Sequence, residues 1–166
     1  MDKNTEEFLK KLLDAREVRY NRQTNLTQKY NKPIISFMLN IPGIEKRNEK
    51  LLKFHKNGVE IIKETLEDSI IFEDYFDEET GMVYMASVDM YALDLKKKMI
   101  EIENTRSGRL YDIDIFDKDM NQITRSKLNL PPRKCIACEN NARECIKEKR
   151  HTYDELIEIA YKIINA

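Results

Sequence analysis

The sequence contains no tryptophan and no excess of charge of either sign. Its 29 lysines and arginines nearly balance 30 aspartates and glutamates, which leaves a formal net charge of −1. A protein that binds nucleic acid broadly normally has a clear basic excess. These two absences argue against a small zinc-stabilised nucleic-acid binder, and any site for an anion must be local.

Long apolar runs are also absent, and none is long enough to span a bilayer. The first residues, MDKNTEEFLKKLL, are highly charged and amphipathic, without the continuous apolar segment and small-residue cleavage site of a signal peptide. We therefore expect a cytoplasmic protein with no membrane partner. Its three cysteines should then be reduced.

The residues that are present suit one globular domain. The chain has 166 residues, of which 41% are hydrophobic and 36% are charged, enough for a core beneath a highly charged surface. No repeat, low-complexity linker or domain boundary is visible. Residues 1–166 are therefore expected to form a single domain.

Hydrophobic periodicity and turn residues predict an α+β fold with a largely antiparallel sheet flanked by helices. A cysteine-rich helical segment follows the break at Pro131–Pro132. The expected elements are a helix from Thr5 into residues 16–23 or onward to Tyr30, a strand at 34–41, a helix at 45–68 with a bend at Gly58, a hairpin of strands 69–76 and 82–90, a helix at 91–104, a hairpin at 108–125 and a helix at 152–165.

The stretch GRLYDIDIF carries two acids one residue apart. Successive side chains of a strand point to opposite faces, so Asp112 and Asp114 share one face. Tyr111, Ile113 and Ile115 make the other face apolar. Two carboxylates placed in this way can hold a hard divalent cation such as Mg²⁺, which commonly binds substrate phosphates as well. An isolated pattern of this kind is more often a solvated strand face.

Two neighbouring features weaken that alternative. Gly108 and Arg109 supply a flexible lead-in and a cation suited to phosphate. The apolar flanks indicate partly enclosed acids, whose mutual repulsion is costly without a cation. A third ligand could come from acids nearby in the sequence, namely Glu101, Glu103, Asp89 or Asp94.

The segment REVRYNRQ places Arg16, Arg19 and Arg22 at intervals of three residues, which fans them along one side of a helix. The planar guanidinium group suits bidentate contacts with phosphate, so this fan could hold a polyphosphate. On spacing alone, an ordinary charged helix face is the simpler interpretation.

All three cysteines and one of the two histidines form the pattern C-x2-C-x6-C-x5-H, made by Cys135, Cys138, Cys145 and His151. Three thiolates and an imidazole match the ligands of a closed tetrahedral zinc site, which would hold together a loop-rich segment. Buried inert thiols and a helix-capping histidine are an equal alternative. A redox pair is less favoured, because no strand precedes the first two cysteines.

Other residues are weaker candidates. Lys46 follows the turn after the first strand, where a helix start could bind an anion, although a simple connecting turn explains the pattern more readily. Arg125 and Arg133 follow the acidic strand and are either surface charges or part of a substrate cleft. His55 has apolar neighbours and is expected to have a packing or surface role rather than to catalyse.

Taken together, six segments resemble the CitX family of apo-citrate lyase phosphoribosyl-dephospho-CoA transferases. They occur in order from Arg16 to the C-terminal helix: REVRYNRQ, IPGIEK, FHKNGV, DLKKKMIEIE, GRLYDIDIF and PPRKCIACENNARECIKEKRH. GRLYDIDIF and PPRKCIAC are the most specific of these blocks. The family usually has tryptophan at the position of Tyr111, whereas both acids match.

The resemblance implies a nucleotidyltransferase-like fold and reaction. The donor would be 2′-(5″-triphosphoribosyl)-3′-dephospho-CoA, and the acceptor a serine of the acyl-carrier (gamma) subunit of citrate lyase, with release of pyrophosphate. Asp112 and Asp114 would bind Mg²⁺, one of them could accept the serine proton, and Glu101 or Glu103 could complete the metal shell. The catalytic and substrate-binding cations would be Arg109, Arg16, Arg19, Lys46, Arg125 and Arg133. Zinc is a prediction from the ligand set and not from the family.

Two alternatives stay open. The same group could be transferred to another carrier, such as that of malonate decarboxylase. Otherwise, the acids and cations could hold a dephospho-CoA derivative or a carrier without any transfer, in a non-catalytic binding protein.

Overall fold

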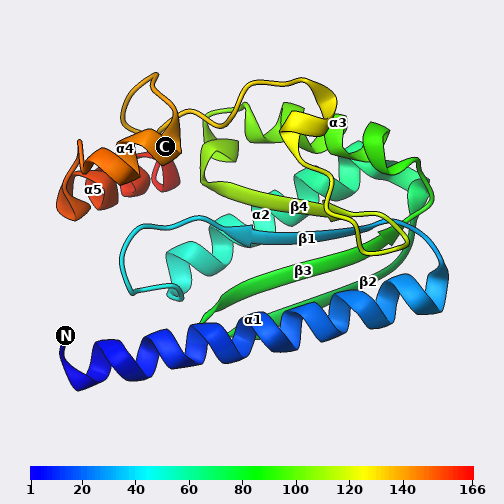
Figure 1. The fold of residues 1–166 in the computed structure, drawn as a ribbon, viewed down its shortest axis with the longest axis horizontal. Helices are drawn as coiled ribbons and strands as arrows, with labels where there is room; N and C mark the ends of the chain where they lie inside the picture. The colour runs from blue at the N-terminus through cyan, green and yellow to red at the C-terminus, as the bar shows by residue number, and fades with distance from the viewer.

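A four-stranded antiparallel sheet, with strands in the order β2-β3-β1-β4, forms the centre of the computed structural model (Figure 1). Residues 1–166 are all described, and helices flank the sheet, which confirms the predicted α+β class. The strands are β1 (Ile34–Leu39), β2 (Ile70–Glu78), β3 (Gly81–Val88) and β4 (Tyr111–Phe116).

A side chain caps the first turn of four helices, and three of these caps use the same type of bond. Asp2, Asn48 and Thr152 each accept a hydrogen bond from the backbone N–H three residues later, which satisfies one of the free donors at a helix start. None of the helices is both long enough and apolar enough to cross a bilayer. The helices are α1 (Lys3–Tyr30), α2 (Glu49–Leu66), α3 (Ala92–Glu103), α4 (Ala142–Glu148) and α5 (Tyr153–Ile164).

The two faces of the sheet differ in character. On one face, α2 and α3 cover an apolar core to which β1 contributes Ile35 and Phe37 and β4 contributes Ile113. On the other face, α1 packs against β1 and β3 and stacks Tyr30 on Phe72 of β2, with ring centroids 5.3 Å apart. Figure 1 shows α1 and α2 on opposite sides of the sheet.

The outer edge of β4 is closed by two side chains of α3. Glu103 Oε2 accepts a hydrogen bond from the backbone N–H of Ile113 at 3.3 Å, and Lys96 Nζ donates to the Ile113 carbonyl at 3.1 Å. All three residues are buried. These bonds satisfy the backbone groups that a neighbouring strand would otherwise pair with.

The predicted hairpin at 108–125 is wrong at both ends. Residues Ser107–Leu110 form a 3₁₀ turn in place of the start of a strand. After β4, the chain turns back through a single bridge between Phe116 and Gln122 and then enters another 3₁₀ turn at Arg125–Leu128. No second strand forms, because the α3 side chains occupy the edge of β4 with which it would have paired.

The other predicted elements are confirmed with shifted ends. The hairpin of β2 and β3 forms, and α1 continues to Tyr30, where Asn31 in a left-handed conformation ends it. α2 begins four residues later than expected, at Glu49, and is continuous through Gly58.

Gly58 lies where α2 meets the sheet, and a β-carbon there would come within 2.6 Å of Phe37 and 3.0 Å of Tyr111. Both rings are buried and packed against other rings, so neither can move away freely. We predict that Gly58→Ala lowers the free energy of unfolding by about 1–3 kcal/mol, although alanine favours helices more than glycine does. Urea denaturation followed by circular dichroism measures this change.

Asn57→Ala is the matched control, because Asn57 is the neighbouring position of the same helix and is exposed. This substitution should leave the stability unchanged or raise it slightly. A Gly58→Ala protein as stable as the wild type would contradict the close contact with the sheet.

Candidate active site and metal centre

The structure places Asp112 and Asp114 side by side on the face of β4 that looks toward α1. In the register with β1, Asp114 lies opposite Ser36 and Asp112 lies opposite Met38. Asp112 is exposed, whereas Asp114 is partly buried. The opposite face carries the predicted apolar row, all of it buried: Tyr111, Ile113 and Ile115.

The surroundings of Asp114 leave its charge partly uncompensated. Burial, together with the negative charge of Asp112, raises the pKa of Asp114 to about 6. The positive charges of Lys96 and Arg19 act against this rise in pKa. The one hydrogen bond to the Asp114 carboxylate comes from Gln122 Nε2, at 3.1 Å. This balance of charge favours the binding of a cation.

The arginine fan of α1 divides between two roles. Arg19 is half-buried, and burial lowers its pKa while the charges of the two β4 acids raise it. Arg16 is exposed, and neither of these arginines forms an ion pair. Arg22 instead pairs with Glu78 at 3.0 Å and lies 3.6 Å above the ring of Phe76. Arg16 and Arg19 are therefore available to bind an anion near Asp112 and Asp114.

The other predicted cations gather around Glu103 and the cysteine segment. Arg125 and Arg133 form ion pairs with the buried Glu103 carboxylate at 3.2 and 3.4 Å. Arg133 also donates to the backbone carbonyl of Arg109 at 2.9 Å, and Arg109 donates to that of Cys135 at 3.2 Å. No hydrogen bond or ion pair joins these three arginines to the acid pair.

Neither Glu101 nor Glu103, the acids predicted to complete the metal shell, joins Asp112 and Asp114 as a third ligand. The Glu103 carboxylate is engaged by arginines and by the β4 backbone, and Glu101 is exposed on α3. The one group of three or more metal-ligating side chains that the fold brings together is the cysteine cluster. A Mg²⁺ site at Asp112 and Asp114 stays a prediction, in which the protein would supply these two carboxylates as ligands.

Lys46 and His55 both have structural contacts. Lys46 Nζ donates to the Ile41 carbonyl, and burial lowers the pKa of this amine. The ring of His55 is fully buried, stacks on Phe37 at a centroid distance of 4.3 Å and lies within 3.1 Å of the Phe37 carbonyl. Burial lowers the pKa of His55 to about 4, so this side chain is neutral at pH 7 and packs in the core.

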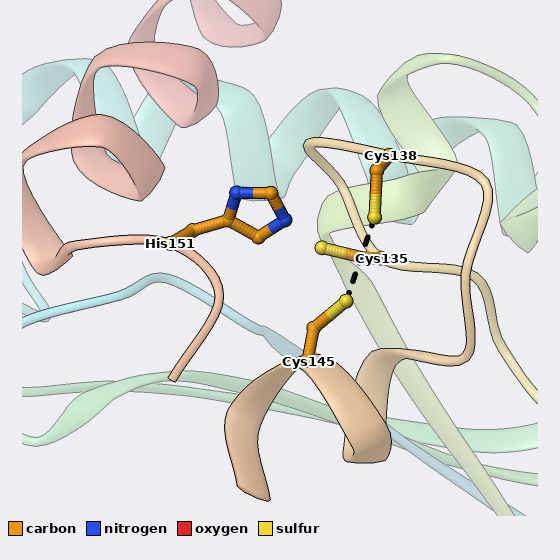
Figure 2. Close-up of side chains that lie close together, drawn as sticks. All are labelled: Cys135, Cys138, Cys145 and His151. Atoms are coloured by element: carbon orange, nitrogen blue, oxygen red, sulfur yellow. Dashed lines mark hydrogen bonds between the residues drawn. The ribbon is translucent and has the colours of Figure 1, made fainter. Parts of the chain in front are cut away.

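The cysteine segment folds into one cluster (Figure 2). Cys135, Cys138, Cys145 and His151 each present one ligand atom, and these atoms all lie within 4.8 Å of one another. The thiols are free of disulfides, and Cys138 Sγ lies 3.4 Å from Cys145 Sγ. The link between α4 and α5 brings the histidine back to the cysteines.

The chemistry of this cluster fits a metal ion such as zinc. His151 Nε2 is buried without a hydrogen-bond partner, which is costly unless another group binds it. The other ring nitrogen, Nδ1, lies 3.9 Å from the Glu155 carboxylate, which is too long for a hydrogen bond. The ligand set predicted from the sequence is therefore assembled, and three thiolates with one imidazole could bind the ion.

Two residues around Asp114 were missed in the sequence. Lys96 lies one helical turn before Ile100 on the buried side of α3, so its charge interrupts the apolar stripe of this helix. Such a position predicts a buried lysine with a specific partner. Gln122 carried no such signal, because it reaches Asp114 only through the turn that follows β4.

The raised pKa of Asp114 links stability to pH. A carboxyl group with a pKa of 3.8 when unfolded and about 6 when folded holds its proton more tightly in the folded state. Its contribution favours folding below about pH 4 and is lost as the pH rises through 6. We predict that Asp114→Asn raises the free energy of unfolding above pH 7 by up to about 3 kcal/mol.

Urea denaturation in the presence of a chelator, from acidic to neutral pH, measures this difference. The gain in stability should disappear as the pH falls toward 4. Asp119→Asn is the matched control, because Asp119 is exposed in the turn after β4 and should show no such dependence. A difference between Asp114→Asn and the wild type that stays constant across this range would rule out the raised pKa.

Comparisons with known proteins agree with the motifs. The family model described as CitX, apo-citrate lyase phosphoribosyl-dephospho-CoA transferase, matches residues 7–166. A "Probable apo-citrate lyase phosphoribosyl-dephospho-CoA transferase" of Vibrio cholerae serotype O1 (strain M66-2) is 30% identical over 158 residues, which cover 90% of this chain and 86% of that protein.

Two further relatives come from other bacteria. A protein of the same name from Streptococcus pyogenes serotype M18 (strain MGAS8232) is 31% identical over 164 residues, covering 95% of this chain and 85% of the relative. The "Apo-citrate lyase phosphoribosyl-dephospho-CoA transferase" of Escherichia coli O1:K1 / APEC is 29% identical over 158 residues, which cover 93% of this chain and 86% of that protein. Because these matches span most of both chains, this protein is an enzyme of the CitX family, the apo-citrate lyase phosphoribosyl-dephospho-CoA transferases.

Proposed function

We propose that this protein transfers the phosphoribosyl-dephospho-CoA group from 2′-(5″-triphosphoribosyl)-3′-dephospho-CoA to a serine of the acyl-carrier subunit of apo-citrate lyase. The observation that carries this proposal is the acid pair on the edge strand β4, with Arg19 of α1 close enough for its charge to act on both acids. The name of the family gives the transferred group and apo-citrate lyase as the acceptor.

In the proposed step, the serine oxygen attacks the α-phosphorus of the donor and forms the new phosphodiester bond. The bond from the α-phosphorus to the bridging oxygen of the leaving group breaks, and pyrophosphate departs with that electron pair. The serine proton passes to one of the two carboxylates or to a nearby acid. No nucleophile from this chain is required, because the carrier supplies it.

The acid pair would hold Mg²⁺ through its two carboxylates, with water and donor phosphates as the other ligands, as is usual for this ion. The bound ion would neutralise the charge that develops on the transferred and leaving phosphates. The partly uncompensated charge of Asp112 and Asp114 supports this assignment. Arg16 and Arg19 would bind the outer phosphates and stabilise the departing pyrophosphate.

We also propose that the cysteine cluster holds one structural Zn²⁺. Between Cys135 and His151, only Ile136 packs against the main hydrophobic core, so this segment has little apolar packing to hold it. A metal ion with four ligands would supply that stability. A cytoplasmic location would keep the thiols reduced and able to bind the ion.

A transfer assay tests the proposed function. Incubation of the protein with the apo carrier, the triphosphoribosyl donor and Mg²⁺ should raise the mass of the carrier by that of the prosthetic group and release pyrophosphate. Asp112→Asn and Asp114→Asn should each lower the rate by about 100-fold or more, because each removes a metal ligand. Asp119→Asn should keep the wild-type rate.

Each alternative has its own outcome in this assay. Donor binding without a mass gain would select a non-catalytic binding protein. Faster transfer to the carrier of malonate decarboxylase would change the acceptor but keep the chemistry. Full activity of folded Asp112→Asn and Asp114→Asn proteins would exclude the acid pair from catalysis.

Metal analysis tests the zinc site. Protein purified without chelators should contain about one zinc ion per chain, as a closed site with four ligands requires. Cys138→Ser should reduce the zinc content and lower the melting temperature, whereas Arg143→Ser, at an exposed position of α4, should change neither. Folded, active protein with much less than one equivalent of zinc would contradict the site.

A further inference from the structure

A cavity of about 750 Å³ lies beside the cysteine cluster. Its walls come from the end of β1, the turn before β4, the cysteine segment and the start of α5. This volume is typical of a site for a small molecule. Four cations and no carboxylate line the cavity: Arg109, Arg133, Lys134 and Lys149.

These cations are only partly neutralised by acids outside the cavity. Glu139, which is exposed, contacts two of them at 3.4 and 2.8 Å. Arg133 shares the Glu103 carboxylate with a second arginine, and Lys149 forms no ion pair. The cavity therefore carries positive charge that favours an anionic ligand.

The rest of the lining suits the organic part of such a ligand. Ile136 and Leu156 supply apolar surface, and Tyr153 lines the same space although its side chain is 74% exposed. Thr152 and Tyr153 lie at the start of α5, on the wall that faces the cysteine cluster. Cations beside a free aromatic ring can bind a nucleotide, because phosphate pairs with the cations and the base stacks on the ring.

The cavity is close to the acid pair. Asn40 lines the cavity and follows Met38, the residue opposite Asp112, by two positions. Two residues of extended chain span about 7 Å. A ligand in the cavity could therefore extend along the end of β1 to the two carboxylates.

We propose that this cavity binds the adenosine diphosphate part of the dephospho-CoA group, while the triphosphate of the donor lies at Asp112 and Asp114. The inference rests on the proposed function and assigns that reaction a nucleotide site. It also gives Lys149 and Tyr153 a role in binding the donor.

The metal cluster forms part of this nucleotide site. Cys135, Cys145 and His151 line the cavity in addition to presenting their ligand atoms to one another. Lys149 lies between the last two of these residues in the sequence. A metal ion at the cluster would fix the wall that carries Lys149, so nucleotide affinity should depend on metal content.

Calorimetric titration of the metal-loaded protein with 3′-dephospho-CoA tests the inference, with ADP as a competitor. Lys149→Glu reverses an unpaired charge in the cavity and should weaken binding by about tenfold. Tyr153→Ala should weaken it by a similar factor through loss of stacking. Lys147→Glu is the matched control, because Lys147 is exposed two residues earlier on α4 and lies outside the cavity. Removal of the metal should weaken binding in the wild type.

Binding that is equal in the wild type, Lys149→Glu and Tyr153→Ala would overturn the nucleotide site. Equal losses in Lys149→Glu and Lys147→Glu would also overturn it, since general surface charge would then explain the effect. Failure of the wild type to bind dephospho-CoA, or of ADP to compete, would overturn it as well. The mass of the carrier, measured separately, decides whether transfer occurs in each of these cases.

Discussion

The buried carboxylate of Glu103 connects the edge of the sheet to the cysteine segment. It accepts a hydrogen bond from the backbone N–H of Ile113 on β4 and forms ion pairs with two arginines. One of these, Arg133, also donates a hydrogen bond to the backbone carbonyl of Arg109. A buried carboxylate is stable only when its charge and its hydrogen-bonding capacity are satisfied in this way. The position of β4, and with it the acid pair, is therefore tied to the residues that wall the nucleotide cavity.

Charged side chains in the candidate site fall into two groups: those neutralised by ion pairs and those whose charge is only partly neutralised. Around Glu103, cations and carboxylate neutralise one another and hold the fold. At the acid pair and in the cavity, charge of one sign is left in excess, which is unfavourable for the isolated protein. Sites that bind charged ligands commonly reduce the stability of the free enzyme in this way. The pairing of negative carboxylates with a positive cavity fits a donor that brings both a metal ion and phosphates.

Local patterns in the sequence predicted those parts of the site that depend on spacing alone. Alternation along GRLYDIDIF indicated the shared face of the two acids, and the cysteine intervals indicated a ligand set that the fold brings together. Contacts between distant segments decided the rest. The hairpin prediction failed because Lys96 and Glu103 occupy the edge of β4. Arg109 was expected beside the acids, but its side chain donates a hydrogen bond to the Cys135 carbonyl instead. This contact joins segments far apart in the sequence, so no local pattern could predict it.

The acid pair lies on β4, and part of the cavity rim is formed by Asn40, just after β1, and Arg109, just before β4. On this side of the cavity, the backbone of the paired strands sets the distance to the two acids, whereas the rest of the wall comes from the cysteine segment and α5. The spacing of the two acids is restricted by the strand itself. Insertion of one residue between Asp112 and Asp114 would place the two carboxylates on opposite faces of β4, because strand side chains alternate. A single intervening residue is therefore the spacing that lets both carboxylates of this pair act on one ligand.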